Sequence, residues 1–494
     1  KQPDKVKEVI NKVKSDGLIA TYDAVNSKLE NPIYPGYANV GRVIAIGKNV
    51  KGFNVGDRVV SNGSHAEFVV VPQNLCAVVP PNVTDKEASF TVLASIGLQG
   101  IRLSKPTFGE SFLVIGLGLI GLLTCQILKS QGINVLGLDP DKKKSDLAKK
   151  LGVNIINYQD KEKVIKTCFQ MSSSSGIDGT IITASTSSND PIEIASNVTR
   201  QRGRIILIGS TKINLKRDLF YKKELSFQVS CSYGPGRYDK NYEDNSIDYP
   251  LPFVRWTENR NFKAILKAFE SNLINTNLLI SHEFSFNKAM EAYNLLNSDE
   301  YSLAILLNYG TEKKSTSKTI EILSQKKNKL NHNISKKNKL SLGFIGCGNY
   351  ASRVLIPAFR KTNSEFSTLV SPSGSKLSFF GKKFLFSKIS SDVNSIFKDD
   401  SIDAVVIATR HDTHFSLVKE SLLSGKSVFV EKPLCMNMKE INSLKEIYSQ
   451  NQILMVGFNR RFAPLTKVLK SKLEQFKEPK SFVYTCNAGY ISED

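Results

Sequence analysis

The distribution of apolar residues predicts a β-rich beginning followed by alternating strands and helices. We interpret three short apolar runs among the first hundred residues as strands, at 41–47 (GRVIAIG), 57–60 (DRVV) and 66–71 (AEFVVV). From Ser111 the pattern changes to FLVIG, a helical segment through Ser130, NVLGLD, and later GTIITAS and GRIILIG. Strands that alternate with helices in this way predict a parallel sheet covered by helices on both faces.

A second stretch of the same kind begins near residue 340. Residues 233–257 are rich in Pro, Tyr and Asp and are interpreted as a long surface connection, and 303–307 is a strand candidate. Residues 312–338 contain many Lys, Ser and Asn, which predicts an exposed, partly helical linker. The alternation then restarts with LSLGFIG, SIDAVVIAT, GKSVFVEKP and QILMVGF. The fold class is therefore α/β, with two Rossmann-type parallel sheets.

The first motif with a chemical meaning is GLGLIG, which follows a strand and opens a helix. In this context Gly116 allows a tight turn, Gly118 lets the backbone approach a diphosphate, and Gly121 permits close packing of helix on strand. Asp139 ends the next strand, where a carboxylate can accept hydrogen bonds from the adenosine ribose and would repel a 2′-phosphate. We therefore expect a dinucleotide site that favours NAD over NADP. The alternative is a glycine-rich turn in an empty domain.

The second motif, GCGNYA, occupies the same position in the second stretch. It contains Gly346, Gly348 and Ala351, and alanine is an accepted third residue. The next strand ends at Ser371 without an acidic residue, and Lys376 follows shortly after. This pattern leaves room for a 2′-phosphate, so the choice between NAD and NADP stays open here.

A lysine follows a later strand of the second stretch. Glu431, Lys432 and Pro433 come directly after SVFV, at the sheet edge where cofactor and substrate are expected to meet. An amine in that place can hydrogen-bond to a reacting hydroxyl or carry its proton. The alternative is an ordinary surface lysine before a turn proline.

Two family resemblances rest on several ordered motifs each. GYANVGRVIAIG, FNVGDRVV, AEFVV and GLGLIG resemble the medium-chain dehydrogenase/reductase superfamily. LGFIGCGNYA, VVIATRHDTHFSLV, GKSVFVEKPL and MVGFNRRF resemble the N-terminal half of the Gfo/Idh/MocA oxidoreductases, and their order resembles bi-domain oxidoreductases that fuse the two families. The resemblance implies the following domains: a GroES-like domain at 1–108 and 241–310, a Rossmann domain at 109–240, a linker at 311–339, a second Rossmann domain at 340–460, and the start of a truncated α+β domain at 461–494.

The first module departs from the zinc-dependent members of the family it resembles. Those members have a histidine where this chain has Tyr37, no cysteine precedes Cys76, and no cysteine-rich loop follows residues 57–60. We therefore expect a module without zinc. Tyr37 and His65 are the nearest candidates for a catalytic proton relay, although a tyrosine at such a place is often a packing residue and a histidine in a Gly-Ser turn is often merely exposed.

In the second module the resemblance assigns the catalytic-lysine position to Lys432 and implies a cis peptide bond before Pro433. It places Thr409 and His414 along the nicotinamide side, with His414 counted among the catalytic residues, and Glu431 beside the cofactor. Family members complete the site with an Asp and a His in the C-terminal domain, which would lie beyond Asp494. The chain begins with Lys1 rather than Met and stops soon after a new apolar run, so we expect a fragment at both ends.

Composition narrows the function classes further. The net charge is +21, but the cations are mostly scattered lysines without interleaved aromatic residues, so we expect no nucleic-acid partner. Residues 111–128 carry no charge, yet three glycines at fixed spacing favour a strand, a turn and a helix over a membrane span. Seven well-separated cysteines without a C-x-x-C pair favour a reducing, cytoplasmic location.

These observations predict an NAD(P)-dependent oxidoreductase with two dehydrogenase modules. The resemblance implies hydride transfer at hydroxyl or carbonyl groups of a small molecule, possible classes being a sugar or a nucleotide sugar, and we expect a homo-oligomer. The rival interpretation is a nucleotide-binding sensor or scaffold in which one or both modules do not turn over.

Overall fold

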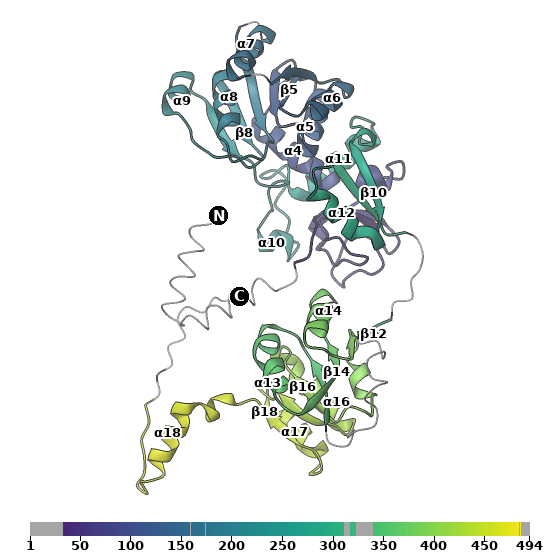
Figure 1. Cartoon of the computed structure of the whole chain (residues 1–494), viewed down its shortest axis with the longest axis vertical. Helices are drawn as coiled ribbons and strands as arrows, with labels where there is room; N and C mark the ends of the chain where they lie inside the picture. The colour runs from purple at the N-terminus through teal and green to yellow at the C-terminus, as the bar shows by residue number, and fades with distance from the viewer. Residues whose placement is uncertain are drawn as a thin grey trace. The chain divides into compact units, whose positions relative to one another are not determined.

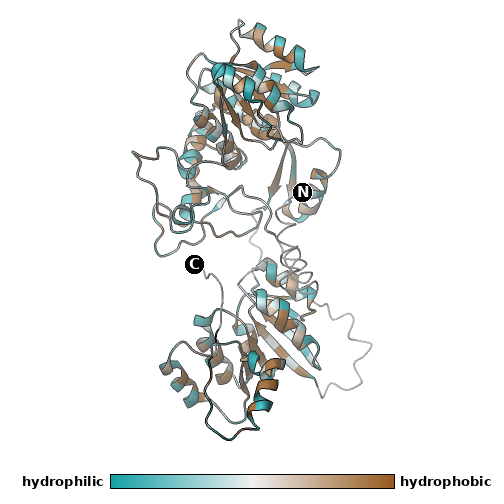
Figure 2. Ribbon diagram, turned by 90° about the vertical axis from the view of Figure 1, so that its left-hand side faces the viewer, coloured by the Kyte–Doolittle hydropathy of each residue, from teal (hydrophilic) through white to brown (hydrophobic). Residues whose placement is uncertain are grey.

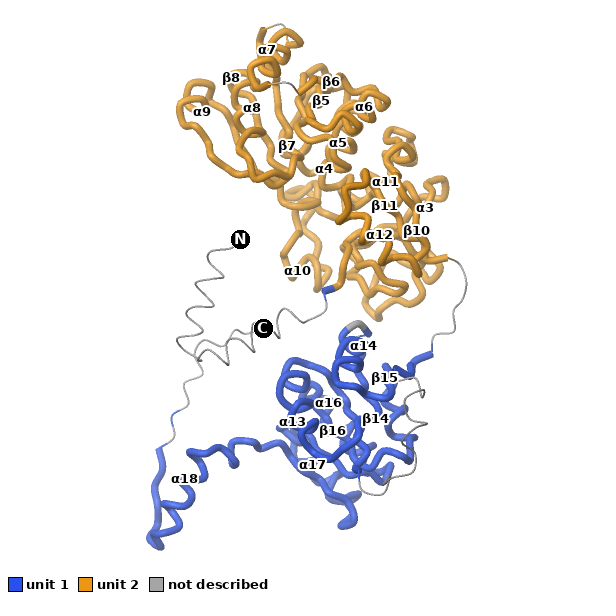
Figure 3. The backbone as a smooth tube through the Cα atoms, in the orientation of Figure 1, with its two compact units in different colours: residues 1–33, 314–494 blue, residues 34–313 orange. Residues whose placement is uncertain are grey.

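The computed structural model describes residues 33–158, 160–172, 174–310, 317–322, 339–372, 374–483 and 485. Contacts between Cα atoms divide the chain into two compact units (Figure 3). Unit 2, Tyr34–Lys313, carries the first module, and unit 1, residues 1–33 and 314–494, carries the second. Each unit is built around one large sheet (Figure 1).

The main sheet of unit 2 is parallel and six-stranded, in the order β6-β5-β4-β7-β8-β9. This is the Rossmann order, in which the first strand of the sheet lies in the centre. Its strands are β4 (Ser111–Ile115), β5 (Asn134–Asp139), β6 (Asn154–Asn157), β7 (Ile177–Ile182), β8 (Thr199–Leu207) and β9 (Ser226–Val229).

Helices cover both faces of this sheet because both faces of its strands are apolar. In β4, Phe112 and Val114 face one hydrophobic cluster while Leu113 and Ile115 face the other. The first cluster is covered by α4 (Thr91–Ser104), α5 (Leu119–Ser130), α6 (Lys142–Lys150) and α11 (Glu258–Glu270). The second is covered by α7 (Lys161–Met171), α8 (Asp190–Val198) and α9 (Arg217–Lys223). Residues 111–128 are thus a buried strand, a turn and a buried helix, as predicted.

The rest of unit 2 consists of smaller elements. β1 (Asn39–Arg42), β2 (Arg58–Ser61) and β3 (Cys76–Val78) form an antiparallel sheet, and β10 (Ile280–Ser285) pairs with β11 (Ala304–Asn308). Three short helices are α3 (Asp85–Ala88), α10 (Lys240–Glu243) and α12 (Ala289–Leu296). β11 confirms the strand expected at 303–307.

Two strand predictions in this region are wrong or too long. The run 66–71 is not a strand, and within the described part of the chain it pairs with no other strand. The run at 41–47 is a strand only as far as Arg42, and Ile44 is 67% exposed. A strand needs a hydrogen-bonded neighbour and a buried face, and apolar composition alone supplies neither.

The sheet of unit 1 has seven strands in the order β12-β15-β14-β13-β16-β17-β18. Six of them repeat the Rossmann order, and β12 adds antiparallel to the edge at β15. The strands are β12 (Thr319–Glu321), β13 (Leu340–Ile345), β14 (Ser364–Val370), β15 (Lys388–Ser390), β16 (Ala404–Ile407), β17 (Ser427–Val430) and β18 (Leu454–Val456). The linker prediction included partial helix, but its described residues 317–322 contain this strand instead; most of 311–339 lies outside the described residues.

The helices of unit 1 cover two further hydrophobic clusters, and the strands between them are largely apolar (Figure 2). α13 (Ile356–Arg360) and α14 (Gly374–Lys383) cover one face, and α15 (Asn394–Phe397), α16 (His411–Leu423) and α17 (Met438–Ile447) cover the other. The described part of 461–494 contains one helix, α18 (Pro464–Leu473), and no strand.

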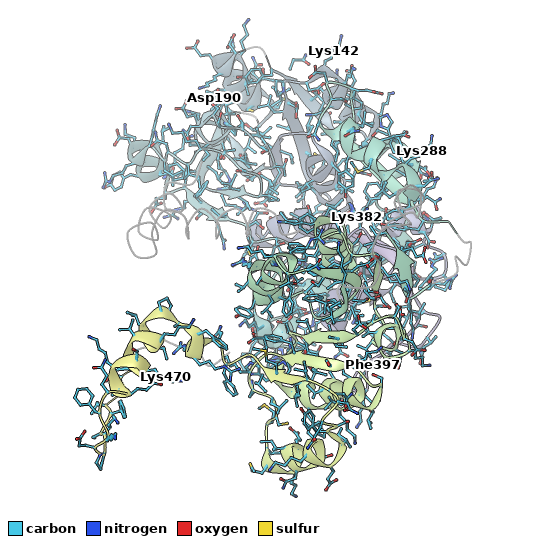
Figure 4. All side chains as sticks on the ribbon, turned by 60° about the horizontal axis from the view of Figure 1, so that its bottom comes forward. Lys142, Asp190, Lys288, Lys382, Phe397 and Lys470 are labelled. Carbon is cyan, nitrogen blue, oxygen red and sulfur yellow. The ribbon has the colours of Figure 1, made fainter. Side chains whose placement is uncertain are left out.

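The excess positive charge is spread over the surface. Lys142, Lys288, Lys382 and Lys470 lie on four different helices (Figure 4). In the described residues, no helix combines the length and the apolar character that crossing a bilayer requires.

We predict that Phe344→Ala destabilises unit 1 alone, by about 3–5 kcal/mol. Phe344 is 1% exposed, and its ring lies 5.0 Å from that of Phe366 and 5.5 Å from that of Phe386. The urea transition of unit 1 followed by circular dichroism should move to lower urea. Emission from Trp256, the single tryptophan, should keep its midpoint because it lies in unit 2. Phe476→Ala, at a 59% exposed position, is the control and should change neither transition.

Candidate functional site

In unit 2 the glycine turn lies where β4 feeds α5. Gly116 has φ of +98°, and a Cβ on it would lie 2.5 Å from the backbone nitrogen of Ala184. A Cβ on Gly121 would overlap the carbonyl oxygen of Gly116. Both positions therefore require glycine for packing. Gly118 differs, because its φ is −68° and a Cβ on it would meet no atom within 4 Å.

The open space at Gly118 lies at the start of α5. Gly118 is the N-cap of that helix, no side chain caps it, and its first turn carries no acidic residue. In contrast, Asp141 caps α6, Asp160 caps α7 and Thr257 caps α11 through their side chains. The first N–H groups of α5 are thus left for an anion, which the helix dipole also favours.

Asp139 joins the end of β5 to this turn. One carboxylate oxygen accepts a hydrogen bond from the backbone N–H of Leu117 at 2.7 Å, and the other accepts one from the N–H of Asp141 at 2.8 Å. The side chain is 9% exposed. Each oxygen keeps a second lone pair for a ribose hydroxyl. The structure therefore brings together Gly116, Gly118, Gly121 and Asp139, the four cofactor residues expected in this module.

Unit 1 repeats the arrangement at the end of β13. Gly346 has φ of +102°, and a Cβ there would overlap the carbonyl oxygen of Ala408. Gly348 again has no atom within 4 Å of a Cβ position, and Ala351 is 1% exposed. The methyl group of Thr409 lies 3.1 Å from the Cβ position of Gly346, so Thr409 borders the glycine turn.

Lys432 is exposed directly after β17, with Glu431 before it and a cis peptide bond to Pro433. The cis bond confirms the expectation drawn from the resemblance. Glu431 Oε1 lies 2.8 Å from the Cβ position of Gly457, next to the end of β18. Lys432 therefore lies just beyond the carboxyl end of β17, whose neighbour β16 ends two residues before Thr409.

His414 does not lie where we expected it. It has no exposed surface, so its ring cannot line an open crevice. Its Nδ1 is 2.7 Å from the carbonyl oxygen of Pro433, and its Nε2 is 3.3 Å from that of Thr409. His414 lies in the first turn of α16. From there its ring contacts both the loop after β16, at Thr409, and the loop after β17, at Pro433.

The two relay candidates of the first module lie on neighbouring segments. The ring of His65 packs on Gly36, and Tyr37 follows it with 49% exposure. His65 Nδ1 is 2.5 Å from the hydroxyl oxygen of Tyr293 on α12. Burial lowers the pKa of His65 and raises that of Tyr293. Sequence reasoning missed Tyr293, because it lies 228 residues from His65 and no local motif marks it.

The described donor set does not fit a zinc ion. His65 already shares Nδ1 with Tyr293, and burial raises the pKa of Cys76 to about 11, which disfavours the thiolate that binds zinc. Among the described residues, no group of three or more His, Cys, Asp or Glu side chains could hold a metal ion. The zinc-free module stays a prediction.

Three family models match the chain. They are an alcohol dehydrogenase GroES-like domain at residues 8–81, a zinc-binding dehydrogenase at 120–245, and an oxidoreductase family with an NAD-binding Rossmann fold, Gfo/Idh/MocA, at 340–458. The three matches follow the order of the motifs along the chain.

Individual proteins resemble one module or the other. The oxidoreductase YceM of Salmonella typhimurium is 35% identical over 138 residues, which are 27% of this chain and 43% of that protein. Sorbitol dehydrogenase of Halalkalibacterium halodurans is 22% identical over 336 residues, 60% of this chain and 90% of that protein. The crystal structure of galactitol-1-phosphate dehydrogenase from Escherichia coli aligns with a TM-score of 0.47 and 18% identity, over 56% of this chain and 84% of that one. The chain thus spans less than half of YceM.

We predict different effects on stability for two alanine substitutions in one turn. Gly121→Ala should lower the stability of unit 2 by about 1–3 kcal/mol, because the added methyl group overlaps the Gly116 carbonyl. Gly118→Ala should stay within about 0.5 kcal/mol of the parent, since its methyl group meets open space. Urea unfolding followed by Trp256 emission measures both. Equal losses in the two variants would mean that the turn is not packed as described.

Proposed function

Because the chain joins a medium-chain dehydrogenase/reductase portion to a Gfo/Idh/MocA oxidoreductase portion, we propose that it is an NAD(P)-dependent oxidoreductase with two dinucleotide sites. The observation that carries this proposal is the open space at Gly118 and Gly348, each in a turn whose other small residues are fully packed. A bound nicotinamide dinucleotide would accept or supply the hydride.

In the first module the chain's own groups would hold an adenosine diphosphate. The uncapped N–H groups of α5 would hold the diphosphate, and the remaining lone pairs of Asp139 would accept hydrogen bonds from the ribose hydroxyls. A carboxylate at this place supports NAD over NADP. In the second module β14 ends at Ser371 without an acid, which leaves both cofactors open.

In the second module we propose that Lys432 transfers the proton of the reacting substrate hydroxyl. Its exposed ammonium group lies at the sheet edge and can donate to, or after losing a proton accept from, a substrate hydroxyl. We assign His414 a positioning role instead of a catalytic one, because it is buried and holds the Pro433 and Thr409 carbonyls. Thr409 and Glu431 stay in the proposal as residues beside the cofactor.

In the first module we propose a proton relay without zinc. His65 and Tyr293 share a 2.5 Å hydrogen bond, and the phenol of Tyr37 is half exposed beside Gly36. An imidazole and a phenol joined in this way can pass a proton between a hydroxyl and solvent, and Tyr37 stays in the proposal as a second phenol on the neighbouring segment.

The substrate class follows the relatives' names. The relatives include a sorbitol dehydrogenase and a D-xylulose reductase, so we propose hydroxyl or carbonyl groups of a sugar or nucleotide sugar. The rival function is a sensor or scaffold that binds dinucleotide without turnover. It would need the two glycine turns but would not need Lys432.

We predict that Gly118→Ala and Gly348→Ala each remove one of two dinucleotide sites. The methyl group would occupy the space into which the diphosphate must approach, so affinity at that site should fall at least about tenfold. Isothermal titration of the full chain with NADH and then NADPH measures this. Gly41→Ala, which also meets no atom within 4 Å, is the matched control and should keep both sites. Two unchanged sites in both variants would refute the assignment.

We predict that Lys432→Ala lowers turnover in the second module by about 10²–10⁴-fold while dinucleotide binding is retained. Turnover is followed as formation of reduced nicotinamide with glucose, sorbitol and UDP-glucose as probes. Lys445→Ala, an exposed lysine of α17, is the control. Unchanged turnover in the Lys432 variant would remove our catalytic assignment, and binding of dinucleotide without turnover in the parent chain would favour the sensor.

A further inference from the structure

A buried carboxyl group in unit 2 belongs to neither of these sites. Glu258 is the first residue of α11 and has no exposed surface. Among the described residues, no N–H or hydroxyl group donates a hydrogen bond to either of its carboxylate oxygens. Burying a charged carboxylate without a donor is costly, so the group needs another way to lose its charge.

A second carboxyl group, that of Glu243 on α10, lies within hydrogen-bonding reach of Glu258. Its Oε1 accepts a hydrogen bond from Arg237 Nη1 at 2.5 Å. The positive charge of Arg237 is therefore engaged by Glu243, and Glu258 has no counter-ion of its own. Glu258 Oε1 instead lies 3.0 Å from the Cβ position of Gly236, which has φ of +109°, so the backbone comes close to the carboxyl group there.

The titratable groups that act on Glu258, or are acted on by it, are Arg237, Glu243, Tyr233, Tyr242 and Tyr249. Burial, and after it the negative charge of Glu243, raises the pKa of Glu258 to about 8. A carboxyl group kept neutral in this way can donate a hydrogen bond to its ionised neighbour, so that two carboxyl groups share one proton.

We infer that Glu258 and Glu243 form a proton-binding site, in which one proton on Glu258 is donated to the carboxylate of Glu243. The ligand of this site is a proton, and Arg237 balances the single negative charge that remains. The site needs neither cofactor nor substrate, and so it does not depend on the function proposed above.

The position of the pair gives the proton a structural consequence. Residues 230–257 connect the end of β9 to α11, and this connection and the first turn of α11 contact the small antiparallel sheet of unit 2. Asn62 Nδ2, just after β2, donates to Tyr233 Oη at 3.2 Å, and Asn259 Nδ2 donates to the carbonyl of Cys76 in β3 at 2.8 Å. Loss of the proton would leave two carboxylates and only one cation, Arg237, beside these contacts. The site therefore couples pH to the connection between the Rossmann sheet and the β1–β3 sheet.

The sign of the pH effect follows from the raised pKa. Between pH 4.5 and 8 the unfolded chain has already released the proton that folded Glu258 still holds. The folded state then binds more protons, so stability falls as pH rises through this window, by up to about tenfold in the folding equilibrium constant per pH unit. Above the window the loss is complete.

We predict that Glu258→Gln removes this pH dependence, because glutamine imitates the neutral carboxyl group. Urea unfolding of the full chain, followed by the emission of Trp256, reports unit 2 two residues from the site. The urea midpoint of the parent should fall relative to that of the variant as pH rises from 4.5 to 8. A gap between parent and variant that stays constant over this range would overturn the inference.

Two further variants keep the test independent of Glu258→Gln. In Glu243→Gln the negative neighbour is gone and Arg237 is released, so the pH at which the parent loses stability should move down. If Glu243→Gln lost stability at the same pH as the parent, the inference of a shared proton would also be wrong. Glu270→Gln, at the last turn of the same helix and paired with Lys267 at 2.7 Å, is the matched control and should follow the parent.

Discussion

The close approach of a glycine turn to the end of the neighbouring strand is the constraint on which both sheets depend. Gly116 packs against Ala184 and Gly346 against Ala408, at positive φ in both cases. Only a residue without Cβ allows the first strand to turn so sharply into its helix. The turn then leaves the helix start open at Gly118 and Gly348, where a side chain would find space and a diphosphate would find donors. Close packing and open space are thus divided between glycines two residues apart.

Local patterns were enough to predict this part of the molecule. Strand, turn and helix at 111–130 follow from apolar periodicity and glycine spacing, which act over a few residues. The same reasoning failed at 66–71, where β-prone residues lack a partner strand, and it missed β12, whose three residues gain their structure only from β15. Pairing across the chain is a property of the fold, and composition does not encode it.

The candidate sites show the same difference between features that local motifs predict and features that depend on distant contacts. The glycine residues, Asp139 and Lys432 stand where their motifs predicted. The contacts of His414 and Tyr293 could not be predicted from spacing, since each depends on a partner brought close by folding: Pro433 for His414, and His65 for Tyr293. Burial changed the role that we assign to His414, since the sequence alone does not show whether a histidine is buried. Buried polar groups are therefore where the three-dimensional structure adds most to the functional argument.

The edge strand β12 has a consequence for the border of the unit 1 sheet. Thr319–Glu321 pairs antiparallel with β15 and ends that side of the sheet with a strand of three residues. An edge strand exposes N–H and C=O groups on which another chain could add a strand, and a very short edge limits this pairing. β12 therefore protects this border of the parallel sheet against aggregation through strand addition.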